Sequence, residues 1–514
     1  MRRQVYFVFT FFFWGLVSEG QVTFQKTYSG PNMDVGSNVY QTNDGGYLIS
    51  ADLLDGAVGY FIGLIKTDSL GDTVWTKKYG PVLDQYLSYH VAEIPASGYL
   101  LTFISLNSNL VLVRTNLNGD TLWSKLFEGN YLEMGIPLQL TADSGIIMAC
   151  TSLDSLQNKT DILLIKTDLN GNMIWTRSYG TLADDNAYAL IQSNDSGYVI
   201  LGSTDLGIMN NYDVLLIKTD STGNFLWAKT YGSWDYDYGN SVFQTMDGGY
   251  IISARTGSGG LQSLIRTDSI GDTLWVKGFY SASAHGESSV LQTDDGEFIM
   301  MNTITDFSGL DKANLMKIDG NGDTLWTQVY GDNALHNFSF SGAQTEEGGF
   351  IFVGTSRGLP PDSVKIYLIK TDSSGWSGCY QSGFPNIIAN PLRDVNVYNP
   401  LVSSTNFITS VGGLMTIVGY NEDVHTLCLN VGMEEPSFNY SSFEIYPNPT
   451  LNEFSISGNY YGQLEIFDIM GNLVLKTEQF DSKPQTVHAP SKAGVYFVKM
   501  KNENEIFIKK LIVQ

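Results

Sequence analysis

The chain has 514 residues, with 29 Lys or Arg against 53 Asp or Glu, and its formal net charge is −24. Binding to nucleic acid requires clustered positive charge, so this composition excludes a nucleic-acid partner. The length leaves room for more than one domain.

The first 20 residues have the pattern of an export signal. Arg2 and Arg3 precede an apolar run over residues 5–17, and small residues follow it. The run is short for a bilayer span, and no other stretch of the chain is long enough. We therefore expect a signal peptide over residues 1–20 and no transmembrane span.

A repeat of about 50 residues follows the signal, and its clearest mark is a tryptophan that recurs in every copy. A Gly-rich turn of the Asp-Gly-Gly-Tyr type recurs out of phase with it, as at residues 44–47. The tryptophan and the Gly-rich turn each occur seven times, which predicts seven equivalent structural units. The repeated tryptophans are Trp75, Trp123, Trp175, Trp227, Trp275, Trp326 and Trp376.

Each repeat contains four short segments rich in β-branched and aromatic residues, separated by Gly, Asn and Asp. Four strands at this period are typical of a β-propeller blade. The fold class is therefore all-β, with a seven-bladed propeller over residues 21–380. Residues 23–30 resemble the fourth-strand motif at residues 75–80, with Phe24 in place of the tryptophan. We expect this N-terminal strand to complete the seventh blade, because a ring with unpaired edges is disfavoured.

Two of the connections in each repeat are short and alike, and they fall on one face of the ring. The other two vary in length and content, and they fall on the opposite face, where propellers usually bind. Aromatic rings beside carboxylates suit stacking on sugars and also suit protein contacts, whereas a purely structural role in packing between blades stays open. The candidate ligand-binding residues of this face are Asp84, Tyr86, Tyr89, His90, Asp184, Asp185, Tyr188, Trp234, Asp235, Tyr236, Tyr238, His285 and His336.

Three function classes remain open for such a face. The favoured one is a non-enzymatic surface or secreted protein that binds a glycan or a protein. The second is a glycosidase or lyase acting on polysaccharide, which would need two facing carboxylates; Asp84, Asp184 and Asp235 are candidates without a sign of pairing. The third is a structural surface-layer component. No catalytic residue is assigned.

The sequence contains few signs of metal or disulfide chemistry. The histidines show no paired ligand spacing, so we expect no metal site and no cofactor. The turn at residues 319–323 resembles the start of a calcium loop, but Tyr330 stands where the bidentate Glu of an EF-hand belongs, so Ca²⁺ binding on this turn stays open. In an exported protein Cys379 and Cys428 could pair, which the sequence leaves open, and Cys150 reads as a buried apolar residue.

The repeat ends before residue 381, and residues 381–440 read as a β-rich connector or accessory region. Residues 441–514 alternate short strands with tight turns, which predicts a small immunoglobulin-like β-sandwich. Four short motifs stand out in this last segment. Their residues include Tyr446, Pro447, Asn448, Pro449, Gly494, Tyr496 and Lys510.

The order and spacing of these motifs resemble the type A sorting domain of the type IX secretion system of Bacteroidetes-type bacteria. The resemblance covers residues 441–514 only. It implies that the type IX machinery is a partner, that the cargo is secreted or held at the outer cell surface, and that attachment to lipopolysaccharide can follow. The repeats also resemble the propeller repeats common in cargo of this system.

Overall fold

The computed structural model describes most of the repeat region and parts of the C-terminal segment, and the chain divides into two compact units, Met1–Gly432 and Met433–Gln514. The described residues form β-strands and no helix, which confirms the all-β class. The described residues are 21–30, 33–55, 59–82, 90–129, 131–132, 136–154, 159–181, 183–205, 212–232, 236–257, 261–279, 288–306, 308–332, 334–358, 364–378, 381–383, 388–389, 394–398, 401–403, 409–411, 423–430, 444–446, 453–457, 462–468, 473–480, 485–488, 490–492, 494–501 and 506–513.

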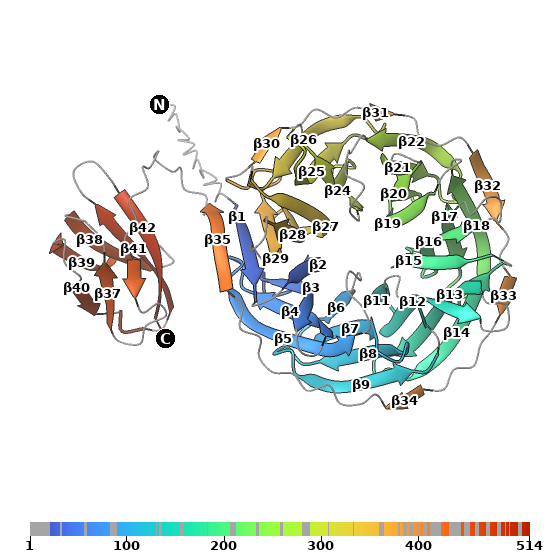
Figure 1. Ribbon diagram of the computed structural model, residues 1–514, viewed down its shortest axis with the longest axis horizontal. Helices are drawn as coiled ribbons and strands as arrows, with labels where there is room; N and C mark the ends of the chain where they lie inside the picture. The colour runs from blue at the N-terminus through green and yellow to red at the C-terminus, as the bar shows by residue number, and fades with distance from the viewer. Residues whose placement is uncertain are drawn as a thin grey trace, which may run out of the picture. The chain divides into compact units, whose positions relative to one another are not determined.

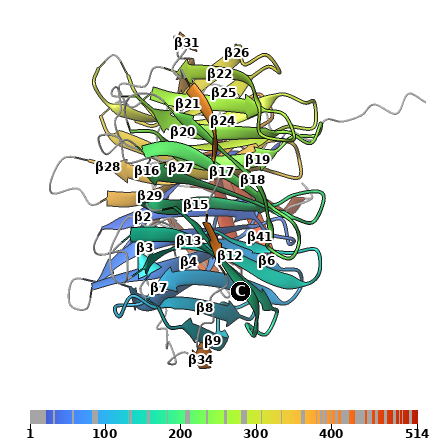
Figure 2. The same ribbon diagram turned by 90° about the vertical axis from the view of Figure 1, so that its right-hand side faces the viewer.

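In the described part of the first unit, seven antiparallel sheets are arranged in a ring around a central axis (Figure 1). The first strands of the sheets lie nearest the axis, and Figure 2 shows the sheets from the side. Each repeat supplies one sheet. The strands of the first four repeats are β2 (Asp34–Gln41), β3 (Tyr47–Asp55), β4 (Gly59–Thr67) and β5 (Thr73–Val82); β6 (Val91–Ile94), β7 (Gly98–Ile104), β8 (Leu110–Thr115) and β9 (Thr121–Phe127); β10 (Tyr131–Leu132), β11 (Leu138–Leu140), β12 (Gly145–Asp154), β13 (Lys159–Asp168) and β14 (Met173–Gly180); and β15 (Asp185–Gln192), β16 (Tyr198–Asp205), β17 (Tyr212–Thr219) and β18 (Phe225–Gly232).

The remaining three sheets follow the same plan, and the last of them takes its fourth strand from the N-terminus. Their strands are β19 (Tyr238–Gln244), β20 (Tyr250–Thr256), β21 (Leu261–Thr267) and β22 (Thr273–Phe279); β23 (Ser289–Gln292), β24 (Phe298–Thr305), β25 (Asp311–Ile318) and β26 (Thr324–Tyr330); and β27 (His336–Gln344), β28 (Phe350–Arg357), β29 (Val364–Thr371) and β1 (Thr23–Ser29).

The sheets pack face to face, because a single sheet of this composition is apolar on both sides. In β17, the run from Val214 to Thr219 is buried throughout, as expected for a central strand covered on both faces. One apolar cluster joins Leu164 of β13 to Tyr198 and Leu215 of the next sheet. Comparable clusters join each neighbouring pair of sheets, so the core is distributed around the ring.

The N-terminal strand closes this ring, as predicted. β1 pairs with β29, and Phe24 lies opposite Lys370 in the register. Phe24 and Tyr28 share an apolar cluster with Ile49 of the first sheet and Ile351 of the last. The two ends of the repeat region are thereby joined by both hydrogen bonds and packing.

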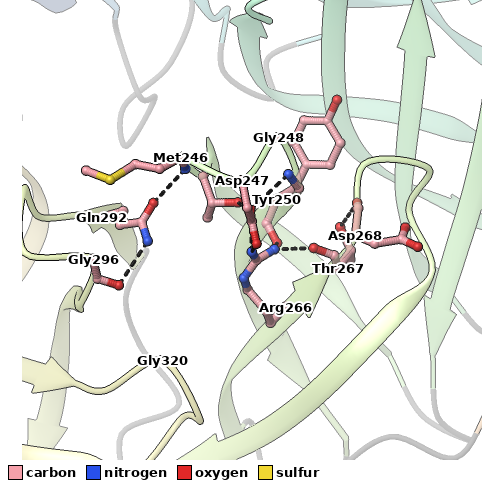
Figure 3. A network of polar contacts seen from close by, with 12 residues as sticks. Met246, Asp247, Gly248, Tyr250, Arg266, Thr267, Asp268, Gln292, Gly296 and Gly320 are labelled. Atoms are coloured by element: carbon pink, nitrogen blue, oxygen red, sulfur yellow. Dashed lines mark hydrogen bonds and ion pairs between the residues drawn. The ribbon is translucent and has the colours of Figure 1, made fainter.

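A glutamine at the end of the inner strand links neighbouring sheets on the face of the short turns. Gln292 accepts a hydrogen bond from the Met246 N–H at 2.8 Å and donates to the Gly296 carbonyl at 2.9 Å (Figure 3). Figure 3 also shows Arg266 against Asp247 of its own sheet, with which it forms an ion pair. This ion pair gives Arg266 a role in the scaffold.

Residues 381–430 add to the outside of the propeller. Their described strands each pair with the outermost strand of a sheet, and they follow the sheets in reverse order. We call these strands the belt; β31 and β34 lie at opposite rims of the ring in both views (Figures 1 and 2). The belt strands, each with its partner, are β30 (Gln381–Gly383) on β26, β31 (Ile388–Ala389) on β22, β32 (Asp394–Tyr398) on β18, β33 (Leu401–Ser403) on β14, β34 (Thr409–Val411) on β9 and β35 (Asp423–Asn430) on β1.

The sequence suggested a connector or accessory region at residues 381–440, and this pairing was not foreseen. Among the described residues, the sheet of β2 to β5 is the one that carries no belt strand. The compact unit correspondingly extends to Gly432 rather than ending near residue 380.

The second unit consists of two small antiparallel sheets with a shared core. Phe454 and Val487 of the first sheet pack in one cluster with Leu464, Val498 and Leu511 of the second. Two sheets that bury one face each against the other form a β-sandwich; its relation to immunoglobulin domains stays a prediction. The strands are β36 (Glu444–Tyr446), β37 (Glu453–Ser457) and β40 (Gln485–His488) in one sheet, and β38 (Gly462–Asp468), β39 (Leu473–Phe480), β41 (Gly494–Lys501) and β42 (Ile506–Val513) in the other.

Candidate functional site

A cavity of about 680 Å³ lies where the inner strands meet at the ring axis. Residues of β2, β15, β19, β23 and β27 line it, together with His90, which directly precedes β6. Burial lowers the pKa of His90 to about 4, so its imidazole is neutral at neutral pH. Among the predicted residues, His90 and Tyr188 face this cavity.

Three tyrosine rings cluster beside the cavity, and we call them the tyrosine platform: Tyr212, Tyr236 and Tyr238. Their ring centroids are 5.7–6.3 Å apart, and the ring planes of Tyr236 and Tyr238 differ by 4°. Tyr236 is 51 % exposed, whereas Tyr212 and Tyr238 are partly buried. The rings therefore form an aromatic stack that is open at Tyr236.

The platform reaches the axial cavity through Tyr188. The Tyr188 ring meets the Tyr238 ring edge-on, with 6.4 Å between centroids. Its hydroxyl lies 3.0 Å from Ser203 Oγ, and burial raises its pKa to about 12, so it stays protonated and can donate or accept a hydrogen bond.

Charged groups surround the platform. Burial raises the pKa of Tyr212, and the negative charges of Asp184 and Asp205 raise it further. Burial also raises the pKa of Tyr238, although Arg255, its cross-strand partner, opposes this shift. Charged groups therefore lie close enough to the platform to shift the pKa values of Tyr212 and Tyr238.

The two predicted carboxylates of this region have local partners. Asp184 forms an ion pair with Lys159 at 3.1 Å and accepts a hydrogen bond from the Thr160 N–H at 3.0 Å. Asp185 is fully buried and accepts from the Thr181 N–H at 2.7 Å. These contacts stabilise the entry into β15, which gives both residues a structural role.

A second row of rings runs along β27. His336 stacks on Phe338, and Phe338 on Phe340, with 6.4 Å between centroids in each pair. His336 also lies 3.0 Å from Asp311, and Phe340 lines the axial cavity. His336 therefore belongs to this row and not to the tyrosine platform.

Several predicted site residues lie outside the described residues, so the structure places neither their backbone nor their side chains. Sequence reasoning missed Tyr212, Asn240 and Phe340, which contact the platform or line the cavity. A signal was present for the last two, because the position four residues before the repeated Gln varies between repeats that are otherwise alike. The predicted residues outside the described ranges are Asp84, Tyr86, Tyr89, Trp234, Asp235 and His285.

Within the described ranges, no cluster of three or more His, Cys, Asp or Glu side chains could hold a metal ion. Asp319 Oδ1 accepts the N–H groups of Asn321 and Asp323, both at 2.9 Å, as in its sister turns, and calcium binding there stays untested. Cys150 is a buried free thiol. Cys379 is outside the described residues and only the backbone of Cys428 is described, in β35, so their pairing stays a prediction.

The predicted sorting residues fall in the second unit. Tyr446 is in β36, Gly494 and Tyr496 are in β41, and Lys510 is in β42. The buried Tyr496 donates its hydroxyl to the Lys492 carbonyl at 2.9 Å. Residues 447–449, the rest of the Tyr-Pro-Asn-Pro motif, lie outside the described residues.

Residues 444–514 match the family described as secretion system C-terminal sorting domain. This segment is a type IX secretion sorting domain, as predicted, and it indicates secretion with attachment at the cell surface. In the described part of the chain, no helix has the length and apolar character to cross a membrane.

No curated protein matches the chain. Solved structures that match include the α-L-arabinofuranosidase Arb93A from Fusarium graminearum, with 11% identity and a TM-score of 0.39, covering 58% of this chain and 98% of that one. An endo-1,5-α-L-arabinanase from Thermotoga petrophila matches with 12% identity and a TM-score of 0.17, covering 65% and 82% of the two chains. At these scores the matches carry no inference about activity.

Proposed function

We propose that this exported protein binds a glycan through the tyrosine platform on the variable face of its propeller. The observation that carries the proposal is the stack of Tyr212, Tyr236 and Tyr238, which is exposed at Tyr236. An exposed aromatic ring such as Tyr236 stacks well on the apolar face of a sugar ring, and its phenol group can bind the sugar hydroxyls. Tyrosine also loses little conformational entropy when it is held in a site.

The surroundings of the platform support a glycan more than a protein ligand. Arg255 lies close enough to influence the phenol of Tyr238, and its guanidinium group can donate hydrogen bonds to hydroxyl groups. A protein partner would favour a larger apolar patch than the single exposed ring found among the described residues of the platform. Tyr236 is the one platform ring that is more than half exposed.

Binding is favoured over polysaccharide cleavage. A glycosidase would need two carboxylates several ångströms apart across the substrate. The described residues that line the axial cavity include no Asp or Glu, and Asp184 is held by Lys159 and Thr160. We therefore assign the face a role in recognition.

Attachment to surface lipopolysaccharide is the second part of the proposal, and it rests on the resemblance of residues 441–514 to type A sorting domains. Recovery of the protein from the cell envelope as a lipopolysaccharide-linked species of raised mass would support it. Release of the entire pool into the medium at unmodified mass would contradict it.

A glycan array tests the binding proposal, with the full chain beside its Tyr236→Ala and Trp376→Ala variants. Trp376 is a matched control, because it is 48 % exposed and follows a short turn on the opposite face. The proposal predicts that Tyr236→Ala weakens binding about tenfold or more, while Trp376→Ala leaves it unchanged. A parent protein that binds no glycan, or a Tyr236→Ala variant that binds like the parent, would overturn it.

A further inference from the structure

The axial cavity has a construction that the propeller fold does not itself require. Four inner strands carry a β-bulge at the same position, where one residue is left out of the register: Ser37 in β2, Tyr188 in β15, Asn240 in β19 and Phe340 in β27. All four residues line the cavity. β-Bulges re-aim a side chain at the cost of one ladder position, and they are frequent next to binding and active sites.

These bulge positions hold different side chains in different repeats. The flanking turns repeat closely, yet the bulge position is Ser, Tyr, Asn or Phe. Ser288 occupies the corresponding place ahead of β23 and also lines the cavity. The bulge position has the same place in each of these inner strands, but its side chain differs from repeat to repeat. The lining of the cavity is therefore asymmetric, so that it can distinguish one orientation of a ligand from another.

The lining is uncharged, and it mixes polar residues with apolar ones such as Leu190, Val242 and Leu291. Its described members include Ser, Asn, Gln and aromatic residues but no Lys, Arg, Asp or Glu, and the low pKa of His90 keeps that residue neutral. Burying an unpaired charge in such surroundings is costly, whereas neutral hydroxyl groups find donors and acceptors. The cavity therefore suits an uncharged ligand with several hydroxyl groups.

The side chains around the cavity are held in place. Asn240 donates its amide to Ser288 Oγ at 2.9 Å, and Tyr188 is fixed by its contact with Ser203. Phe340 is held by its stack on Phe338. Such preorganisation lowers the entropy cost of binding. The volume of about 680 Å³ lies within the range of small-molecule sites.

We propose that the axial cavity binds the uncharged terminal sugar of the glycan whose following residues stack on the tyrosine platform. The inference rests on the proposed function, and it adds a second contact and a preference for chain ends. Tyr188 connects the two parts, because it lines the cavity and touches Tyr238 of the platform. A chain entering along the platform thus meets the cavity with its end.

The first test uses the unaltered protein, so it does not depend on the folding of a variant. Titration calorimetry compares neutral hexasaccharides (cellohexaose, maltohexaose, laminarihexaose and mannohexaose) with the same compounds carrying a terminal sugar oxidised to its uronic acid. The inference predicts that oxidation of the terminal sugar weakens binding about tenfold or more. Equal affinities for the neutral and oxidised forms would overturn it.

The second test separates the cavity from the platform. Asn240→Leu removes the amide from the cavity while it keeps the branched shape of the side chain, and Tyr236→Ala removes the exposed platform ring. We expect Asn240→Leu to weaken hexasaccharide binding about tenfold while long polymers, which offer many internal residues, still bind. If Asn240→Leu matches the parent on all ligands while Tyr236→Ala loses them, the cavity is a solvent channel and only the platform proposal survives. If Tyr236→Ala matches the parent on every glycan, the proposed function fails.

Discussion

The hydroxyl of Tyr28 donates a hydrogen bond to the backbone carbonyl of Gly71 at 2.6 Å, and this contact joins the last sheet of the propeller to the first. The same bond recurs between neighbouring sheets around the ring. Its other copies are Tyr79–Gly119, Tyr179–Gly223, Tyr231–Gly271 and Tyr330–Gly375.

Removing one of these hydroxyl groups should destabilise the fold. Tyr231→Phe leaves the Gly271 carbonyl without its buried donor, at a cost of about 1–3 kcal/mol in the free energy of unfolding. Urea unfolding of the variant and the parent measures the difference. Phe279 holds the equivalent place in the next sheet, so Phe279→Leu, which removes no hydroxyl, is a control for packing. A Tyr231→Phe variant as stable as the parent would contradict a stabilising role for this bond.

The turn glycines beneath the tryptophans should tolerate no side chain. A Cβ at Gly223 would lie 2.7 Å from Trp175 Cζ3, and the residue has φ +76°. Gly248 has a similar φ of +84° but open space around it, so Gly248→Ala carries the backbone strain alone, about 1 kcal/mol. We expect Gly223→Ala to lower the unfolding free energy by at least ~1 kcal/mol more than Gly248→Ala. If Gly223→Ala and Gly248→Ala lose the same unfolding free energy in thermal or urea unfolding, the contact with the Trp175 ring adds nothing to the cost.

Acidification should weaken the propeller through His90. The folded-state pKa of about 4 lies below the value of about 6.5 for unfolded histidine, so the unfolded state binds the proton first. The stability of the parent therefore falls as the pH drops from about 6.5 to about 4, whereas His90→Gln lacks this contribution. Unfolding free energies across this pH range should decline more steeply for the parent. Parallel curves would contradict the lowered folded-state pKa of His90.

The belt should protect the outer edges of the sheets. A chain that ends at Gly378 lacks β30 to β35 and exposes the strand edges that they cover, which promotes association. We expect this variant to form oligomers or aggregates in light scattering. A chain that ends at Gly432 keeps the belt and is the matched control. Monomeric behaviour of both truncated chains would show that the belt strands are dispensable.

The repeat made the propeller predictable because every blade obeys the same packing rule. Trp175 and Tyr179 face the next sheet in the same way as their counterparts in other repeats, so a spacing in sequence becomes a position in space. The closure by Phe24 and Tyr28 could be predicted for the same reason. The belt could not be predicted, because β31 has two residues and β33 has three. Strands this short show no sequence pattern of their own, and they form because a strand edge of the propeller is there to pair with.

The site was only partly predictable. Tyr236 and Tyr238 were found because they stand in a variable loop rich in aromatic residues. Tyr212 starts a strand in another repeat, and only folding brings its ring within 6.2 Å of Tyr236. The bulge at Asn240 depends on a one-residue break in register, which the alternation of a short strand does not reveal.

The central claim is glycan recognition at the tyrosine platform, and calorimetric titration of the full chain with the best array ligand tests it most directly. Tyr236→Trp keeps an aromatic face in place, whereas Tyr236→Ala removes it. The account predicts affinity within a few-fold of the parent for Tyr236→Trp and a loss of about tenfold or more for Tyr236→Ala. Equal affinities of Tyr236→Ala and the parent would contradict the account.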